Sequence, residues 1–322
     1  MRHKAVGKQG LVISILLAAA MVALGLTAFP LGRADEAAGF CLPSPDQWEI
    51  PQPYSCAAGF LLMLVTAFGL ILLNKKNNFI AGQDLVYPAA FLVMTAANPW
   101  LTHFLGESVI LAFANLICLA LLFGGYGRRD NQNRSFYLAS VLGLGAMIQY
   151  AFLLYAPVYL LAAVMLKTMR LRDAAAYVIG LCAPFWVAVG CGIIPIENFR
   201  IPDVEFIFHG FAPPPEVLVM LISTAVTVLL GLIILMNNTV SLMRASSKAR
   251  AFNRVVNLLG IATTIFIVVD FANMTAYLCT LFLCVGIQLA NAFGYASARR
   301  PAWLALLLAA VYAGIFLVTV YV

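Results

Sequence analysis

Long apolar runs alternate with short polar segments along the whole chain. The first run is 11–30 and the last is 303–322, and each has about 20 residues. An α-helix rises about 1.5 Å per residue, so a run of about 20 apolar residues can cross the ~30 Å hydrocarbon core of a bilayer. The pattern predicts crossings at 11–30, 56–74, 85–100, 109–123, 135–166 (twice), 174–194, 217–236, 255–269, 276–293 and 303–322. We therefore expect an all-α, polytopic membrane bundle with about eleven transmembrane helices.

The first run admits two interpretations, because the preceding residues Met1–Gly10 are polar and basic. A basic start followed by an apolar run is also the pattern of a cleaved signal peptide. The run is long for such a peptide, whose apolar region has about 7–15 residues. We therefore favour an uncleaved first transmembrane helix.

The central segment 128–173 does not fit a single crossing. About 32 residues, Ser135–Leu166, carry no charge, and a helix of that length would reach ~48 Å. Both flanks are basic, so the chain must enter the membrane and return, with a turn near Gln149 and Tyr150. The hairpin is either two tilted short helices or partly re-entrant. Short elements at membrane depth need burial in protein or a wet cavity, which predicts a site reaching down from the outer face.

The basic residues predict the orientation in the membrane. Of the 19 Lys and Arg residues, all except Arg33 and Arg200 fall on segments that the eleven crossings place on one side. Cytoplasmic segments carry the excess of Lys and Arg in membrane proteins. We therefore expect a cytoplasmic amino terminus, a periplasmic carboxyl terminus, and periplasmic loops at 31–55 and 195–216.

Composition agrees with a membrane protein and excludes other classes. Hydrophobic residues make up 63% of the chain, charged residues make up 10%, and the mean hydropathy is +0.97. A soluble domain has roughly 45–50% apolar and about 25% charged residues. We expect residues 1–322 to form one integral membrane domain. The net charge of +6 belongs to the cytoplasmic loops, so no nucleic-acid partner is expected.

Acidic residues show the opposite bias. Solvation of the external loops is the simpler explanation, and an acidic outward-facing cavity suited to a cation, an amine or a metal-bound diphosphate is the functional one. The acids predicted to lie outside are Asp35, Glu36, Asp46, Glu49, Glu107, Glu197, Asp203, Glu205, Glu216 and Asp270.

A short external turn carries a first group of candidate substrate-binding residues. His103 and Glu107 are four residues apart and follow Asn98. In a helical turn they would share one face, but two ligands are too few for a metal site. We expect no metal site there, and favour a capping role for Glu107 at the start of the next helix.

Three further residues are candidates for substrate binding. Asp270 lies closest to membrane depth among the acids, and an intramembrane carboxylate indicates function by default. Arg200 could bind a phosphate or pair with neighbouring acids. Gln149 lies at the central turn; such amides within apolar runs tie helices together more often than they bind substrate, and Asn115, Gln288 and Asn291 belong to the same class.

Two of the seven cysteines fall at the first external loop. Cys41 and Cys56 would face an oxidising periplasm, where a disulfide between them is plausible. The other five lie in apolar runs and are expected to be small core residues.

The order of features from Asn77 to Pro184 resembles an uncharacterised multi-pass inner-membrane family common in the Bacteroidetes. The resemblance implies a membrane fold in a bacterial inner membrane and no assigned reaction. It is carried by Asn77-Asn78, the Arg128–Arg134 loop, Ser135-Phe136-Tyr137, Gly143, Gly145, Pro157, Leu171-Arg172-Asp173, Gly180 and Pro184.

A broader likeness concerns the first external loop. An acidic pair close behind the first helix, together with short helix pairs, is similar to GT-C-type glycosyltransferases that use polyprenyl-phosphate donors. That similarity implies Asp35 or Glu36 as the catalytic base, with a lipid-linked glycan as partner. No cofactor is expected, except a divalent metal ion if the chain is such a transferase. The alternative is a non-catalytic membrane subunit with a protein partner, or a carrier of a small solute or ion.

Overall fold

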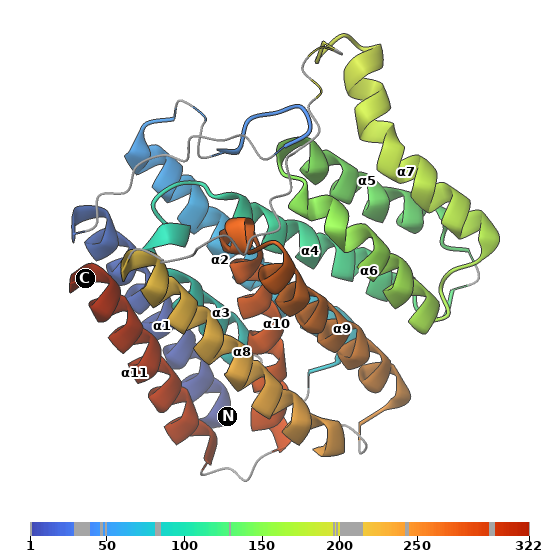
Figure 1. Cartoon of the computed structure of the whole chain (residues 1–322). Coiled ribbons are helices and arrows are strands. Elements are labelled where there is room, and N and C mark those ends of the chain that lie inside the picture. The colour runs from blue at the N-terminus through green and yellow to red at the C-terminus, as the bar shows by residue number, and fades with distance from the viewer. Residues whose placement is uncertain are drawn as a thin grey trace.

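The computed structural model describes residues 2–28, 39–45, 48, 50–80, 85–128, 130–195, 197, 199, 215–241, 245–295 and 300–321. These residues form α-helices and short 3-10 turns, without a β-strand (Figure 1). The α-helices are α1 (Arg2–Ala28), α2 (Gln52–Asn77), α3 (Val86–Ala96), α4 (Glu107–Gly124), α5 (Gln132–Ile148), α6 (Ala151–Met165), α7 (Leu171–Gly190), α8 (Pro215–Ser241), α9 (Ser247–Val269), α10 (Met274–Tyr295) and α11 (Arg300–Tyr321). The 3-10 turns are η2 (Pro99–Leu101) and η5 (Phe271–Asn273).

Six helices in the described part of the chain are long and apolar enough to cross a membrane, namely α2, α4, α7, α8, α9 and α10. Shorter apolar stretches lie in α1, α3, α6 and α11. Large side chains such as Trp186 and Met236 are 81% and 76% exposed, which suits contact with lipid rather than with water. The chain is therefore an all-helical, multi-pass membrane protein.

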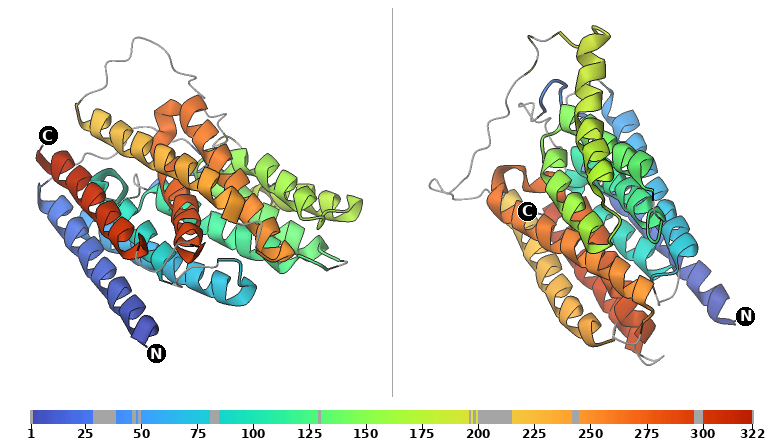
Figure 2. Two further views of the ribbon diagram at one scale, coloured as in Figure 1. Left: turned by 90° about the horizontal axis from the view of Figure 1, so that it is seen from below. Right: turned by 90° about the vertical axis from the view of Figure 1, so that its right-hand side faces the viewer.

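Helix α10 is the centre of the bundle. In its apolar segment Met274–Ala292, 94% of the residues are buried, because α3, α4, α8 and α9 all pack against it. Helices α1 and α11 lie side by side along one flank, and helices α5, α6 and α7 lie along the other (Figure 2). The start of α1 and the end of α11 lie at opposite ends of the bundle (Figure 1).

Only part of the predicted third crossing, 85–100, is helical. Helix α3 has 11 residues and rises only ~16 Å. The Asn98 amide donates to the Met94 carbonyl at 2.9 Å, and the backbone of Asn98 is extended. Pro99 follows and disfavours the helical conformation at the residue before it. The run therefore breaks into a short helix and the turn η2.

Glycines set the close packing of α5 on α7, which is the most extensive helix pair in the fold. A Cβ atom at Gly180 would collide with the Phe136 carbonyl, and one at Gly143 would collide with the Leu181 carbonyl. The Ser140 hydroxyl also donates to the Gly180 carbonyl at 3.0 Å. Because no side chain separates the two backbones, α5 and α7 form one unit.

The predicted reversal at Gln149 and Tyr150 separates two short helices. Helix α5 ends at Ile148 after 17 residues, and α6 begins at Ala151 and has 15. The described part of the first predicted loop lies against this turn: the backbone N–H groups of Cys41 and Leu42 donate to the Met147 carbonyl at 3.3 and 2.9 Å. The loop segment thereby satisfies carbonyl groups that the end of a helix leaves unpaired.

Candidate functional site

The tips of two helical hairpins meet inside the bundle, and we call this region the hairpin end. One tip is the α5–α6 turn, and the other is the α9–α10 turn with η5. The Tyr150 hydroxyl of the first tip donates to Asp270 Oδ2 of the second at 2.7 Å. This hydrogen bond joins residues 120 positions apart in the chain.

Asp270 is the centre of the hairpin end, and only 1% of its surface is exposed. Besides Tyr150, the Tyr277 hydroxyl donates to Oδ2 at 2.5 Å and the Asn273 amide donates to Oδ1 at 3.1 Å. The Asn273 amide also donates to the Tyr150 hydroxyl at 2.6 Å. In the part of the chain that the structure describes, all these donors are neutral. A buried carboxylate with neutral donors and no basic partner costs free energy whenever it is ionised.

The local backbone explains why Asp270 occupies this position. It caps the carboxyl end of α9, with its N–H donating to the Phe266 carbonyl at 2.8 Å. The turn η5 then reverses the chain, and Asn273 N–H donates back to the Asp270 carbonyl at 3.2 Å. Tyr277 follows in the first turn of α10, so its ring reaches back to the carboxylate.

A second carboxylate lies close to the first. Glu107 begins α4, and its Oε2 accepts a hydrogen bond from Gln149 Nε2 at 2.8 Å. Gln149 is fully buried, and its Oε1 has no hydrogen-bond partner among the described residues. Glu107 lies in the first turn of α4, where a carboxylate is favoured by the helix dipole, but α4 has no side-chain hydrogen bond that caps its amino terminus.

His103 and Asn98 face other partners. Residues 103–106 are not helical, so the condition under which His103 and Glu107 would share one helical face is not met. His103 Nδ1 lies 2.9 Å from the Pro99 carbonyl, and its ring is 1% exposed. Asn98 is bonded to the end of α3. Within the described ranges no three His, Cys, Asp or Glu side chains gather in a way that could hold a metal ion.

A column of buried polar groups continues inward from Asp270. The Tyr277 ring lies against the Tyr155 ring, with centroids 6.4 Å apart. The Tyr155 and Thr263 hydroxyls are hydrogen-bonded at 3.0 Å. Farther in, the Asn115 amide donates to Thr280 Oγ1 at 3.0 Å and accepts from Tyr159 at 2.9 Å. The predicted role of Asn115 in tying helices together matches these contacts.

None of the tyrosines of this site was predicted to be a site residue, although Tyr150 was expected at the turn. Tyr150 and Tyr277 hold the carboxylate, and Tyr155 and Tyr159 extend the column. A usable signal was present, because Tyr155 and Tyr159 are four residues apart in an apolar run. A buried phenol needs a polar partner, so two on one helical face indicate a polar strip inside the bundle.

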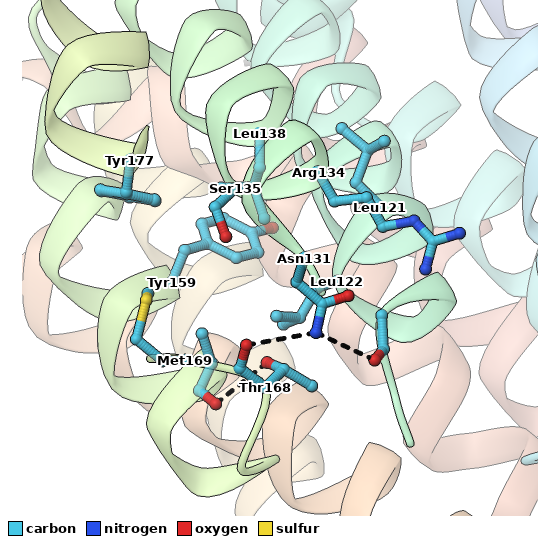
Figure 3. A pocket seen from close by; sticks show the side chains of 12 residues that line it. Leu121, Leu122, Asn131, Arg134, Ser135, Leu138, Tyr159, Thr168, Met169 and Tyr177 are labelled. Atoms are coloured by element: carbon cyan, nitrogen blue, oxygen red, sulfur yellow. Dashed lines mark hydrogen bonds between the residues drawn. The ribbon is translucent and has the colours of Figure 1, made fainter. Parts of the chain in front are cut away.

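A small pocket lies at the opposite end of the bundle, between α4, α5, α6 and α7 (Figure 3). Its volume is about 20 Å³, enough for about one water molecule. Asn131 donates to the Gly125 and Thr168 carbonyls at 3.3 and 3.2 Å, and Arg134 donates to the Gly124 carbonyl. These bonds join the loops, and we assign the pocket a structural role.

The two candidate disulfide cysteines are free thiols in the structure. Cys56 is buried in the main core, whereas Cys41 packs beside Met147 and Ala188 in a separate cluster. They belong to different packing groups, so the predicted disulfide is not formed there. Burial raises the pKa of the Cys41 thiol, which keeps it in the less reactive protonated form.

Three of the predicted site residues, Asp35, Glu36 and Arg200, lie outside the described residues. The described candidates from three separate segments, Glu107, Gln149 and Asp270, come together at the hairpin end. Comparison of the chain with protein-family models, with curated proteins and with solved structures found no match.

Proposed function

We propose that this chain is a carrier of small cations that exchanges them for protons, and that Asp270 binds the proton. The observation that carries the proposal is the burial of Asp270, at 1% exposure, among neutral donors from two hairpins. An ionised carboxylate at membrane depth needs a proton or a cation to neutralise it. Either partner satisfies the site, so one can replace the other.

The exchange step is balanced in charge. When a cation leaves, the Asp270 carboxylate takes up one proton and becomes a neutral carboxylic acid. When the proton is released, the carboxylate is again free to hold a cation. Because Tyr150 belongs to one hairpin and Tyr277 to the other, a change in the charge of Asp270 alters the bonds that join the two hairpins.

The remaining topology belongs to the same proposal. We place the chain in a bacterial inner membrane with eleven crossings, a cytoplasmic amino terminus and the hairpin end toward the periplasm. The opposite ends occupied by the start of α1 and the end of α11 support an odd number of crossings (Figure 1). Under this orientation Glu107 and Asp270 lie toward the periplasmic end of the bundle, where their negative charge attracts cations from outside.

The test uses vesicles that contain the purified protein and a trapped pH-sensitive dye. Addition of Na⁺, K⁺ or a small amine outside is expected to raise the internal pH for at least one of them. Asp270→Asn should abolish this response, whereas Asp130→Asn, in an exposed loop, should retain it. A response that survives Asp270→Asn contradicts the assignment of Asp270, and failure of every cation to change the internal pH of wild-type vesicles contradicts the carrier.

A transferase of the GT-C type is the second candidate, favoured by the position of the first loop. The segment from Gly39 to Leu42 lies against the end of α5, beside Gln149, and Glu36 precedes Gly39 by three positions in the sequence. In this hypothesis Asp35 or Glu36 is the catalytic base and a polyprenyl-linked glycan is the donor. Loss of glycan transfer in Asp35→Ala/Glu36→Ala, with the cation response unchanged, would favour it over the carrier.

A further inference from the structure

A cleft opens between α8 and α9 on the surface of α10. Both helices pack extensively on α10 but make little contact with each other, so a narrow cleft remains between them above buried residues of α10. The cleft has a volume of about 120 Å³, and its floor is formed by Leu281, Cys284, Val285 and Gln288. It is distinct from the hairpin end.

Two glycines border the cleft near Gln288. A Cβ atom at Gly231 of α8 would lie 3.1 Å from Val285 Cγ2, and one at Gly260 of α9 would lie 3.4 Å from Cys284 Cβ. Both glycines therefore let α8 and α9 approach α10 closely. A larger side chain at either position would have to displace α10 or extend into the adjoining cleft.

One polar atom at the floor of the cleft has no partner. Gln288 is 6% exposed, and its Nε2 donates to Asn257 Oδ1 at 3.2 Å. Its Oε1 is buried and accepts no hydrogen bond among the described residues. A Cβ atom at Gly231 would lie 3.9 Å from this oxygen, so the oxygen lies beside a part of α8 that carries no side chain. A buried acceptor without a donor is unfavourable.

The rim of the cleft faces lipid. Leu232, Ile261 and Ile265 are 48%, 47% and 52% exposed, and all three belong to helices that can span the membrane. A ligand would therefore enter from the bilayer and would be largely apolar. An apolar cavity of about 150 Å³ accommodates benzene, so the cleft matches one aromatic ring in size.

We propose that this cleft binds a membrane-dissolved aromatic alcohol, such as the ring of a quinol, whose hydroxyl donates a hydrogen bond to Gln288 Oε1. The ring lies over Leu281 and Val285, between Gly231 and Gly260. The apolar walls select a ring from the bilayer, and the unpartnered oxygen selects a ring with a donor. The binding is reversible and requires no covalent step. It does not depend on the carrier function.

The test compares two tritium-labelled probes that differ in one donor and have the size of one ring. Phenol carries a hydroxyl group, and toluene carries a methyl group of similar size in its place. Binding of each probe to the full chain in lipid nanodiscs is measured against empty nanodiscs. We expect about tenfold tighter binding of phenol, the effect of one hydrogen bond of about 1.4 kcal/mol.

Three variants locate the binding site. Gly231→Leu should remove saturable binding of both probes, because the new side chain fills the cleft. Gln288→Met should weaken phenol binding about tenfold, to the level of toluene. Gly314→Leu, on an open face of α11 with no atom within 4 Å of the new Cβ, is the matched control and should bind normally.

Each outcome decides the proposal. Equal binding of the two probes to wild type would overturn the role of Gln288 and indicate that a water molecule satisfies its oxygen. Saturable binding that survives Gly231→Leu would overturn the site itself. Elution of Gly231→Leu and Gln288→Met as monodisperse protein, at the wild-type volume, separates loss of binding from loss of fold. Asp270→Asn should leave probe binding unchanged.

Discussion

Among the described residues, two of the buried polar clusters differ in their chemistry. The hairpin end contains two carboxylates, at Asp270 and Glu107, together with phenols. The second cluster lies between α8, α9 and α10 and contains only amides, and we call it the amide cluster. Its members are Asn238, Asn253, Asn257, Gln288 and Asn291. Amides keep the same charge at every physiological pH, whereas a carboxylate can gain or lose a proton.

The hydrogen bonds of the amide cluster explain its role. Asn291 donates to Asn253 Oδ1 at 2.6 Å, and Asn253 donates to the Phe79 carbonyl at 3.0 Å. Asn238 of α8 donates to the Gln288 carbonyl of α10 at 2.7 Å. These bonds join α8 and α9 to α10, and α9 to the segment after α2, in agreement with the predicted role of Gln288 and Asn291. In the carrier proposal the two clusters have different roles, because only the carboxylates can bind a proton.

The largest expected effect is at the centre of the hairpin end. Asp270→Ala leaves the Tyr150 and Tyr277 hydroxyls and the Asn273 amide without their acceptor. Since each unsatisfied buried donor costs about 1–3 kcal/mol, we expect a loss of about 3 kcal/mol or more in the free energy of unfolding. Thermal unfolding in detergent measures it, with Asp130→Ala as the exposed control. Equal unfolding temperatures for the two variants would contradict the structural role of Asp270 at the hairpin end.

A smaller effect is expected in the amide cluster. Asn253→Leu removes the amide that donates to the Phe79 carbonyl and the acceptor of the bond from Asn291, and should cost about 1–2 kcal/mol of unfolding free energy. The cation response of vesicles should persist, because no charged group is altered. If Asn253→Leu abolished that response in folded protein, the proposed division between the clusters would be wrong.

Removal of a single tyrosine hydroxyl at the hairpin end tests the same comparison with a smaller change. Tyr150→Phe keeps the ring and removes one hydrogen bond to Asp270, so we expect a loss of about 1 kcal/mol in stability. The variant should also weaken the cation response, since the link between the two hairpins is lost. Tyr312→Phe, which removes a buried hydroxyl bonded to Thr227, is the matched control: its stability should fall similarly and its cation response should not.

The smallest effect concerns the cysteines. Cys41→Ser and Cys56→Ser should each change the unfolding temperature only slightly, and a reducing agent should change it no further, because both thiols are free. Electrophoretic mobility with and without reductant provides the check. A reductant-dependent shift in mobility that disappears in Cys41→Ser would show that Cys41 forms a disulfide.

Much of the fold follows from hydropathy alone, since apolar runs must be helical to satisfy their backbone in lipid. The turn at Gln149 and the break near Asp270 were predicted because polar residues interrupt long uncharged runs there. The 85–100 run was predicted too long, since its hydropathy continues beyond the bond from Asn98 to Met94 that ends the helix. The pairing of Gln149 with Glu107 could not be predicted, because it depends on how separate hairpins pack.

The tight pairing of α5 with α7 has a mechanical consequence. Helix α7 packs mainly on α5, and only 22% of the residues in its apolar segment are buried. It therefore presents to lipid the largest share of surface among the helices long enough to span. Since mismatch between a hydrophobic helix and the bilayer thickness costs free energy, a change in bilayer thickness would act directly on α7. Through the glycine contact at Gly180 that force would pass to α5, and so to the turn that holds Tyr150.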